Sequence, residues 1–319
     1  VEVNFLWLFG DSPSTEVLAD PKTVEASEIY SDDGVLIGKY FTENRSSVGI
    51  FDISEPLLIT LVHTEDERFF EHNGVDYSAL LGAFKDALFG RARGASTITQ
   101  QLVKNKFKMR TTYNNGPLCK IPGIRTLIIK AKEWNAAKQI EDRFEKLDIL
   151  KMYLNTVYFG SNAYGIKAAA KTYFNTTPDK LNYEQSACII GLLKATTYYN
   201  PVRNPENNER RRKIILNNLV SHKMLTQQEC DSILAVPFTL NFKSESNLDG
   251  MALYFRDAVS SELQDWCDAN NVNLYTDGLK IYTSIDSRMQ KYAEQAVAKQ
   301  MAENQKRFFK NWGKENPWR

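Results

Sequence analysis

The chain has 319 residues, of which 43% are hydrophobic, so it can bury a substantial core as one large domain or two ordinary ones. Forty basic residues stand against 39 acidic ones, which removes any overall electrostatic reason to expect nucleic acid as a partner. The four cysteines form no CxxC pair and the three histidines no ligand cluster, so no zinc site is expected. The cysteine spacing leaves their disulfide state open, and no stretch reaches the roughly 18 to 20 apolar residues of a spanning helix.

The first region with a clear pattern runs from Ser27 to Phe41, SEIYSDDGVLIGKYF. Asp33-Gly34 lies there between two short β-rich runs, a pattern that predicts a hairpin. Near the other end, a polar linker is expected at 241–249, an amphipathic helix at 251–267 and a strand at 278–285. The chain therefore begins with a short β lead-in and ends with an α/β piece.

A glutamate on the expected apolar face of a helix is the first candidate for chemistry. Ser54, Glu55 and Pro56 supply a helix cap and first turn, and Asn73-Gly74 predicts the end of that helix. Glu65 falls at helical spacing on one stripe with four residues of the kind that pack inside, namely Leu58, Val62, Phe69 and His72. Burial raises the pKa of a carboxylate, so Glu65 is a candidate general base. The alternative is a surface charge near a helix end.

The segment that follows, YSALLGAFKDALFG (77–90), is dense in Leu, Ala and Phe. It predicts either a core helix or a helix that dips into a lipid surface. Gly90 to Gly94 then reads as a flexible basic loop with two arginines.

A second helix is expected after Thr97, because Thr97 and Gln100 have capping-box spacing. Thr97, Gln101 and Lys104 then share one polar face, with a hydroxyl, an amide and an ammonium. Such a face could hold a sugar and a phosphate, although a solvated face would have the same pattern.

A third helix carries a second carboxylate. Breakers predict a loop over 109–125, and helical periodicity returns from Leu127 to Leu147. Lys130 and Glu133 lie one turn apart on a common face of this helix. The alternative is an ordinary surface ion pair. Two carboxylates on separate helices favour sugar and phosphate chemistry over acyl transfer, and GxSxG, SxxK, GxxxxGK[ST] and GxGxxG are all absent.

Five ordered motifs carry a resemblance to a known family. They are EDERFFEHNGVD (65–76), GASTITQQLVKN (94–105), KAKEWNAAKQIE (130–141), KLDILKMYLNTVYFGSNAYGI (146–166) and RRKIIL (211–216). With these motifs the sequence resembles the bacterial peptidoglycan glycosyltransferases, the N-terminal module of class A (bifunctional) penicillin-binding proteins.

The resemblance implies a mainly α fold, with a lysozyme-like lobe and a small jaw that contacts the membrane. It divides the chain into a membrane-proximal lead-in (1–45), a glycosyltransferase domain (46–236), and a linker with the start of a transpeptidase domain (237–319). DGLKIYTSIDSRMQKYAE (277–294) is similar to the junction before that second enzyme, whose SxxK serine is not found here. The expected location is the outer face of the bacterial cytoplasmic membrane, with the anchor outside this chain.

The implied reaction joins lipid II units into glycan strands, inverts the anomeric linkage and releases undecaprenyl pyrophosphate. Glu65 is implied as the base, and Glu133 as a catalytic group at the leaving pyrophosphate. A divalent metal, Mg²⁺ or Mn²⁺, is expected there, with Glu133 or Asp66 as its ligand. The remaining implied substrate-binding residues are Asp66, Phe69, His72, Ser96, Thr97, Gln101, Lys104, Asn105, Arg125, Lys130, Asn155, Gly160 and Tyr164.

The implied partners are lipid II, the growing glycan strand, the membrane surface and other cell-wall synthesis proteins, with no nucleic acid. One rival is a lysozyme-like hydrolase or lytic transglycosylase, which would not need lysines beside a leaving group. Another is a silent glycan-binding module, against which the presence of both glutamates argues.

One departure from the family pattern concerns the third motif. The family has Arg-Lys where this chain has Ile129-Lys130. Arg125 precedes Ile129 by one helical turn, so we expect its guanidinium to replace the missing arginine if the helix extends back that far. The alternative is that Arg125 is a solvated loop residue.

Overall fold

The computed structural model describes residues 8–14, 25–41, 44–45, 47–89, 94–121, 123–243 and 250–313. The chain separates into two compact units, one of Val1–Thr23 with Glu43–Ser244 and the other of Val24–Thr42 with Glu245–Arg319. The predicted basic loop at 90–93 and residues 244–249 of the predicted linker lie outside the described residues. The three-part domain division stays a prediction.

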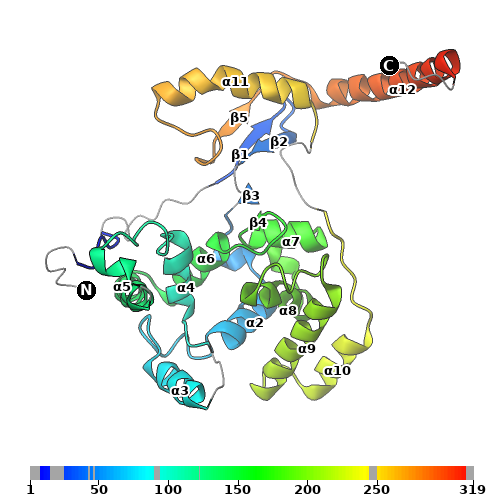
Figure 1. Ribbon diagram of the computed structural model, residues 1–319. Helices are drawn as coiled ribbons and strands as arrows, with labels where there is room; N and C mark the ends of the chain where they lie inside the picture. The colour runs from blue at the N-terminus through cyan, green and yellow to red at the C-terminus, as the bar shows by residue number, and fades with distance from the viewer. Residues whose placement is uncertain are drawn as a thin grey trace. The chain divides into compact units, whose positions relative to one another are not determined.

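The larger unit is built mostly of helices (Figure 1), as the sequence predicted. Its α-helices are α2 (Glu55–Glu65), α3 (Tyr77–Leu88), α4 (Ile98–Lys106), α5 (Ile124–Glu141), α6 (Lys146–Thr156), α7 (Ile166–Phe174), α8 (Tyr183–Gly191), α9 (Pro205–Ser221) and α10 (Gln227–Ala235). Short 3₁₀ turns are η2 (Ile50–Asp52), η3 (Pro117–Lys120), η4 (Pro178–Lys180) and η5 (Leu192–Lys194), and the two-residue strands β3 (Asn44–Arg45) and β4 (Ala163–Tyr164) pair in parallel.

The core of this unit forms where α4 packs against α5 and α6, and α8 packs against α2 and α9. Leu61 of α2, Leu102 of α4 and Tyr153 of α6 are fully buried in one cluster. Because burial of apolar surface is the main driving force of folding, this cluster fixes the helices whose ends carry the candidate site.

The smaller unit joins two segments that are far apart in the sequence in one sheet (Figure 1). The predicted hairpin is present, with β1 (Ser27–Tyr30) antiparallel to β2 (Leu36–Tyr40) and Gly34 at a positive φ of 75° in the turn. β1 also pairs in parallel with β5 (Lys280–Tyr282), and the helices α11 (Leu253–Ala269) and α12 (Ser287–Trp312) complete the unit. The β lead-in and the C-terminal piece therefore fold together.

Two predicted helix boundaries are wrong. Helix α2 begins at the predicted Ser54 cap but ends at Glu65, well before Asn73-Gly74. The chain turns there because the Asp66 carboxylate accepts from the backbone N–H of Ile98 and so caps α4, a helix that is distant in the sequence. Phe69 and His72 consequently do not share a helical stripe with Glu65.

The helix predicted over 127–147 is two helices. α5 begins earlier, at Ile124, and ends at Glu141, and α6 begins at Lys146. The chain turns between them with Phe144 packed against the main core, and Glu145 has extended backbone before α6. The earlier start places Arg125 on α5, as the sequence argument required.

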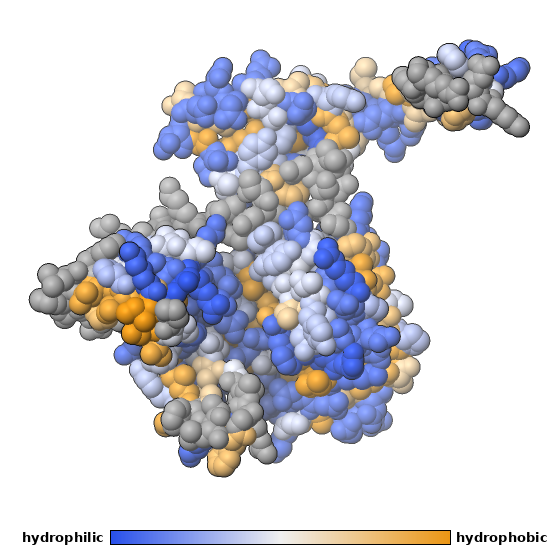
Figure 2. All heavy atoms as spheres, in the orientation of Figure 1, coloured by the Kyte–Doolittle hydropathy of each residue, from blue (hydrophilic) through white to orange (hydrophobic). Residues whose placement is uncertain are grey.

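Apolar side chains are exposed on two parts of the larger unit. Ile121, Ile124 and Leu127 gather over the start of α5, where Figure 2 shows a hydrophobic surface. Tyr77 and Leu81 are more than 60% exposed on α3, which is not the burial expected of a core helix. In the described part of the chain, no helix has both the length and the apolar character needed to cross a membrane.

Candidate active site

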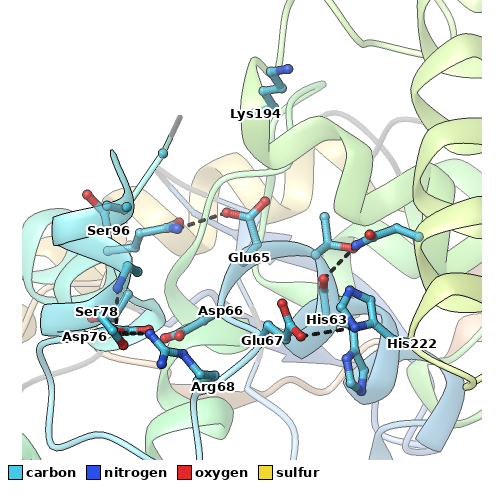
Figure 3. Close-up of a pocket in the computed structure, with 18 of the residues that line it drawn as sticks. His63, Glu65, Asp66, Glu67, Arg68, Asp76, Ser78, Ser96, Lys194 and His222 are labelled. Carbon is cyan, nitrogen blue, oxygen red and sulfur yellow. Dashed lines mark hydrogen bonds and ion pairs between the residues drawn. The ribbon is translucent and has the colours of Figure 1, made fainter. Parts of the chain in front are cut away.

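Glu65, the last residue of α2, lies in a cleft of about 670 Å³. Figure 3 shows it between Ser96 on one side and His63 and His222 on the other, whose rings lie 5.2 Å apart and tilted by 30°. Burial raises the pKa of the Glu65 carboxyl. The Gln101 side chain opposes this shift, because its Nε2 donates to Glu65 Oε2 at 2.9 Å. The cleft thus holds a carboxylate that takes up a proton more readily than an exposed one.

Two cations act on Glu65 that the sequence argument did not include. Arg211 of α9 and Lys194 of η5 line the same cleft, and their charges favour the ionised carboxylate. The burial effect remains the larger one, so the pKa is raised overall. Arg211 opens the fifth sequence motif and was therefore recognisable, whereas Lys194 has no comparable signal.

The neighbouring carboxylates are occupied by structural bonds. Asp66 receives His72 Nε2 at 2.9 Å and the Ile98 N–H at 2.9 Å. Asp76 pairs with Arg68 and accepts from the N–H of Ala79, near the start of α3. Glu67 also lines the cleft, but its side chain is 54% exposed and its Oε1 lies 3.1 Å from His222 Nδ1. Glu65 differs from these carboxylates in that burial raises its pKa.

A second cavity, of about 320 Å³, lies at α5. It is lined by Arg110, Arg125, Thr126, Ile129, Lys130 and Glu133. Glu133 is 0% exposed, and its Oε2 lies 2.6 Å from Lys130 Nζ. The cavity thus brings three cations together around one buried carboxylate, and it includes Arg110, which the sequence argument missed. Its signal was only a basic run, KFKMR (106–110), that leads into the predicted loop.

Lys130 and helix α4 connect the two cavities. Lys130 Nζ donates to Ser96 Oγ at 3.1 Å, and Ser96 lines the Glu65 cleft. On α4, Gln101 contacts Glu65, whereas Lys104, about 4.5 Å further along the axis, interacts electrostatically with Glu133. Burial lowers the pKa of Lys104, and the nearby Arg110 lowers it further. Side chains of α4 and of Lys130 therefore connect the proton acceptor to the cluster of cations.

The fit of a divalent metal differs between the two predicted ligands. Both oxygens of Asp66 already accept hydrogen bonds, so Asp66 does not fit. Glu133 Oε1 has no hydrogen-bond partner among the described residues and could bind a cation together with phosphate oxygens. No group of three or more His, Cys, Asp or Glu that could hold a metal occurs in the described ranges.

Several residues that were predicted to bind substrate make contacts within the protein. Phe69 is fully buried in the main core, and the Thr97 hydroxyl donates to the Gly74 carbonyl at 2.7 Å while it caps α4. Its partner in the predicted capping box, Gln100, also bonds to the Gly74 carbonyl. Asn155 bonds to the backbone of Val48.

The remaining predicted residues divide between the two cavities and positions outside them. Asp66, Ser96, Thr97 and Gln101 line the Glu65 cleft, and Arg125 and Lys130 line the second cavity. The described lining of both cavities does not include Phe69, His72, Lys104, Asn105, Asn155, Gly160 or Tyr164. None of this tests their roles with substrate, which stay predictions.

Comparisons with known proteins identify a family for this chain. The family model described as Transglycosylase matches residues 33–220. Penicillin-binding protein 1A of Escherichia coli (strain K12) is 34% identical over 287 residues, which cover 89% of this chain and 32% of that protein. The protein of the same name from Neisseria meningitidis (strain Z2491) is 34% identical over 301 residues, 94% of this chain and 36% of that one.

A solved structure was also found, that of penicillin-binding protein 1A from Haemophilus influenzae. It has a TM-score of 0.45 and 23% identity, and covers 86% of this chain and 29% of that one. The chain spans about a third of the length of the curated relatives it matches. It belongs to the transglycosylase family. Within that family it is a peptidoglycan glycosyltransferase module of the class A penicillin-binding protein type, an enzyme of cell-wall synthesis.

Proposed function

We propose that this module polymerises lipid II into β-1,4-linked glycan strands with release of undecaprenyl pyrophosphate. The observation that carries the proposal is a buried carboxylate of raised pKa that side chains of α4 and Lys130 connect to a cluster of cations. Such a pair suits a reaction in which one oxygen loses a proton while a pyrophosphate departs.

Glu65 acts as the general base in this proposal. The 4-hydroxyl oxygen of the acceptor sugar forms a bond to the anomeric carbon of the donor sugar, and its proton passes to Glu65. The raised pKa supports this role, because a base works best when its pKa approaches the working pH. A single displacement of this kind inverts the anomeric centre, from an α-linked pyrophosphate to a β-linked glycan.

The cation cavity receives the leaving group. The bond from the anomeric carbon to the pyrophosphate oxygen breaks, and the electron pair goes to that oxygen. Lys130, Arg125 and Arg110 line the cavity and neutralise the charge that develops there. A pyrophosphate stabilised in this way leaves without a general acid, which a glycosidase requires.

A divalent cation, Mg²⁺ or Mn²⁺, would supply further charge neutralisation at the pyrophosphate. Glu133 would be its protein ligand through Oε1, because Oε2 is paired with Lys130. The Glu133 carboxylate also holds the Lys130 ammonium in place, since the two lie 2.6 Å apart.

We further propose that the module works at a membrane surface, on the outer face of the cytoplasmic membrane. The exposed apolar residues of α3 and of the start of α5, among them Leu81 and Leu127, would contact the lipid (Figure 2). The growing strand and other cell-wall synthesis proteins are the remaining proposed partners.

The proposal is tested by incubating the protein with fluorescently labelled lipid II in the presence of Mg²⁺. The expected product is a ladder of glycan polymers that lysozyme degrades, with none formed by Glu65→Gln. The rival hydrolase would instead release soluble fragments from purified cell-wall sacculi. Release of fragments without polymer formation from lipid II would overturn the proposal.

A further inference from the structure

The side-chain amide of Gln101 is held at both of its ends. Its Nε2 donates to Glu65 Oε2 at 2.9 Å, and its Oε1 accepts from the hydroxyl of Tyr153 at 2.8 Å. A glutamine amide can rotate by a half-turn and present either its donor or its acceptor to a neighbour. Only the donor end stabilises an ionised Glu65, so the orientation of this amide matters for the base.

Tyr153 is suited to fix that orientation. Its side chain is fully buried in the main core on α6, so the hydroxyl cannot swing away from Gln101. Burial raises the pKa of Tyr153 well above its usual value, and the hydroxyl therefore stays protonated and able to donate. A donor on this side of the amide favours the acceptor end of Gln101 facing Tyr153 and the donor end facing Glu65.

We propose that Tyr153 is a positioning residue of the glycosyltransferase reaction, which acts by fixing which end of the Gln101 amide faces Glu65. This inference rests on the proposed role of Glu65 as the base. Tyr153 does not line the described cleft, so its effect must pass through Gln101. The arrangement ties down Oε2 of Glu65 and leaves Oε1 to take the proton of the acceptor hydroxyl.

The sign of the effect follows from the bonds. The Gln101 donor lowers the pKa of Glu65 against the larger effect of burial, and the other charges acting on Glu65 are Arg211, Lys194 and Asp66. In Tyr153→Phe the amide loses its fixed orientation, so the pKa of Glu65 rises further. The base must be ionised to act. On acidification, the rate of Tyr153→Phe should therefore begin to fall at a higher pH than the rate of the parent protein.

The test uses Tyr153→Phe with Tyr173→Phe as the matched control. Tyr173 is also fully buried, but its hydroxyl donates to the Phe159 carbonyl at 3.0 Å, away from Glu65. The pKa of the Glu65 carboxyl is measured by carbon-detected NMR on protein labelled at glutamate, which needs no turnover. We expect a rise of at least about half a unit in Tyr153→Phe and none in Tyr173→Phe.

Activity provides the second readout. The kcat of Tyr153→Phe should fall by severalfold to about tenfold with little change in KM, as for the loss of one hydrogen bond. In a Gln101→Leu background, Tyr153→Phe should cause no further loss. An unchanged Glu65 pKa, or equal losses in both tyrosine variants, would overturn the inference. If the parent protein formed no polymer from lipid II while the NMR shift was still seen, the proposed function would fail and the positioning contact would stand. If Glu65→Gln polymerised lipid II normally, the role of Glu65 as the base would fail, and with it the role of Tyr153 in the reaction.

Discussion

The two glutamates of the site show how one residue type takes two roles. Glu65 faces an open cleft, where burial raises its pKa and its nearest bond comes from a neutral amide. Glu133 is 0% exposed and lies against the ammonium of Lys130. The first carboxylate is prepared to gain a proton, and the second is paired with a cation. The surroundings, rather than the residue type, divide acid–base work from charge binding.

The largest effect is expected of Glu65→Gln, which tests whether Glu65 is the base. The amide has nearly the same shape but cannot accept the proton, so polymerisation should fall by roughly a hundredfold to ten-thousandfold. The rate is measured with labelled lipid II, and thermal unfolding checks that the variant is folded. Near-normal activity in a folded variant would remove Glu65 from the role of base.

Lys130→Ala tests the role of the cation beside Glu133 and should slow turnover of lipid II by more than about tenfold. The variant also leaves Glu133 buried without its ion-pair partner, which is itself destabilising. The double variant Lys130→Met with Glu133→Gln removes both charges and keeps the fold testable. The control is Lys138→Ala, which removes an exposed lysine of the same helix. Equal rates in the Lys130 and Lys138 variants would contradict a leaving-group role.

Arg125→Ala should have a smaller effect, because its side chain is exposed and its charge is partly screened. We expect a loss of about threefold to tenfold, of the size of one solvent-accessible charge contact. Arg110→Ala, in the same cavity, should weaken turnover to a similar extent, and the exposed Lys120 provides the control. If Arg125→Ala turns over lipid II like the parent, Lys130 and the metal must suffice without it.

The smallest expected effect is none at all. No serine of this chain has a lysine three residues further on, and no KTG sequence is present. A labelled β-lactam should therefore form no covalent adduct, as judged by gel fluorescence and intact mass. An adduct on any serine would show an acyl-transfer site that the motifs do not reveal.

Local signals made part of the fold predictable. The Asp33-Gly34 turn and the Ser54 cap act through neighbouring residues, and both are present. The end of α2 was not predictable in the same way, because it depends on Asp66 reaching Ile98, 32 positions away. Long-range contacts of this kind leave no periodic pattern in the sequence.

The residues of the candidate site likewise divide into those that local patterns predicted and those whose position depends on long-range contacts. Glu65 and the pair Lys130 and Glu133 could be proposed from spacing and from motifs. Arg110 and Lys194 could not, because each reaches its cavity from a segment whose position depends on tertiary packing. The expected contact of Gln101 with substrate stays a prediction, and its bonds to Glu65 and Tyr153 add an internal role that its spacing did not reveal.

The position of Asp66 between two helices of the site has a consequence for inhibitor discovery. This residue ends the helix that carries Glu65 and also caps the helix that carries Gln101. A substitution that altered the cleft wall here would disturb the base and its hydrogen-bond partner together. Mutations that confer resistance to a compound bound against this part of the cleft wall should therefore be rare, because the changes that weaken binding of the compound would also weaken the enzyme.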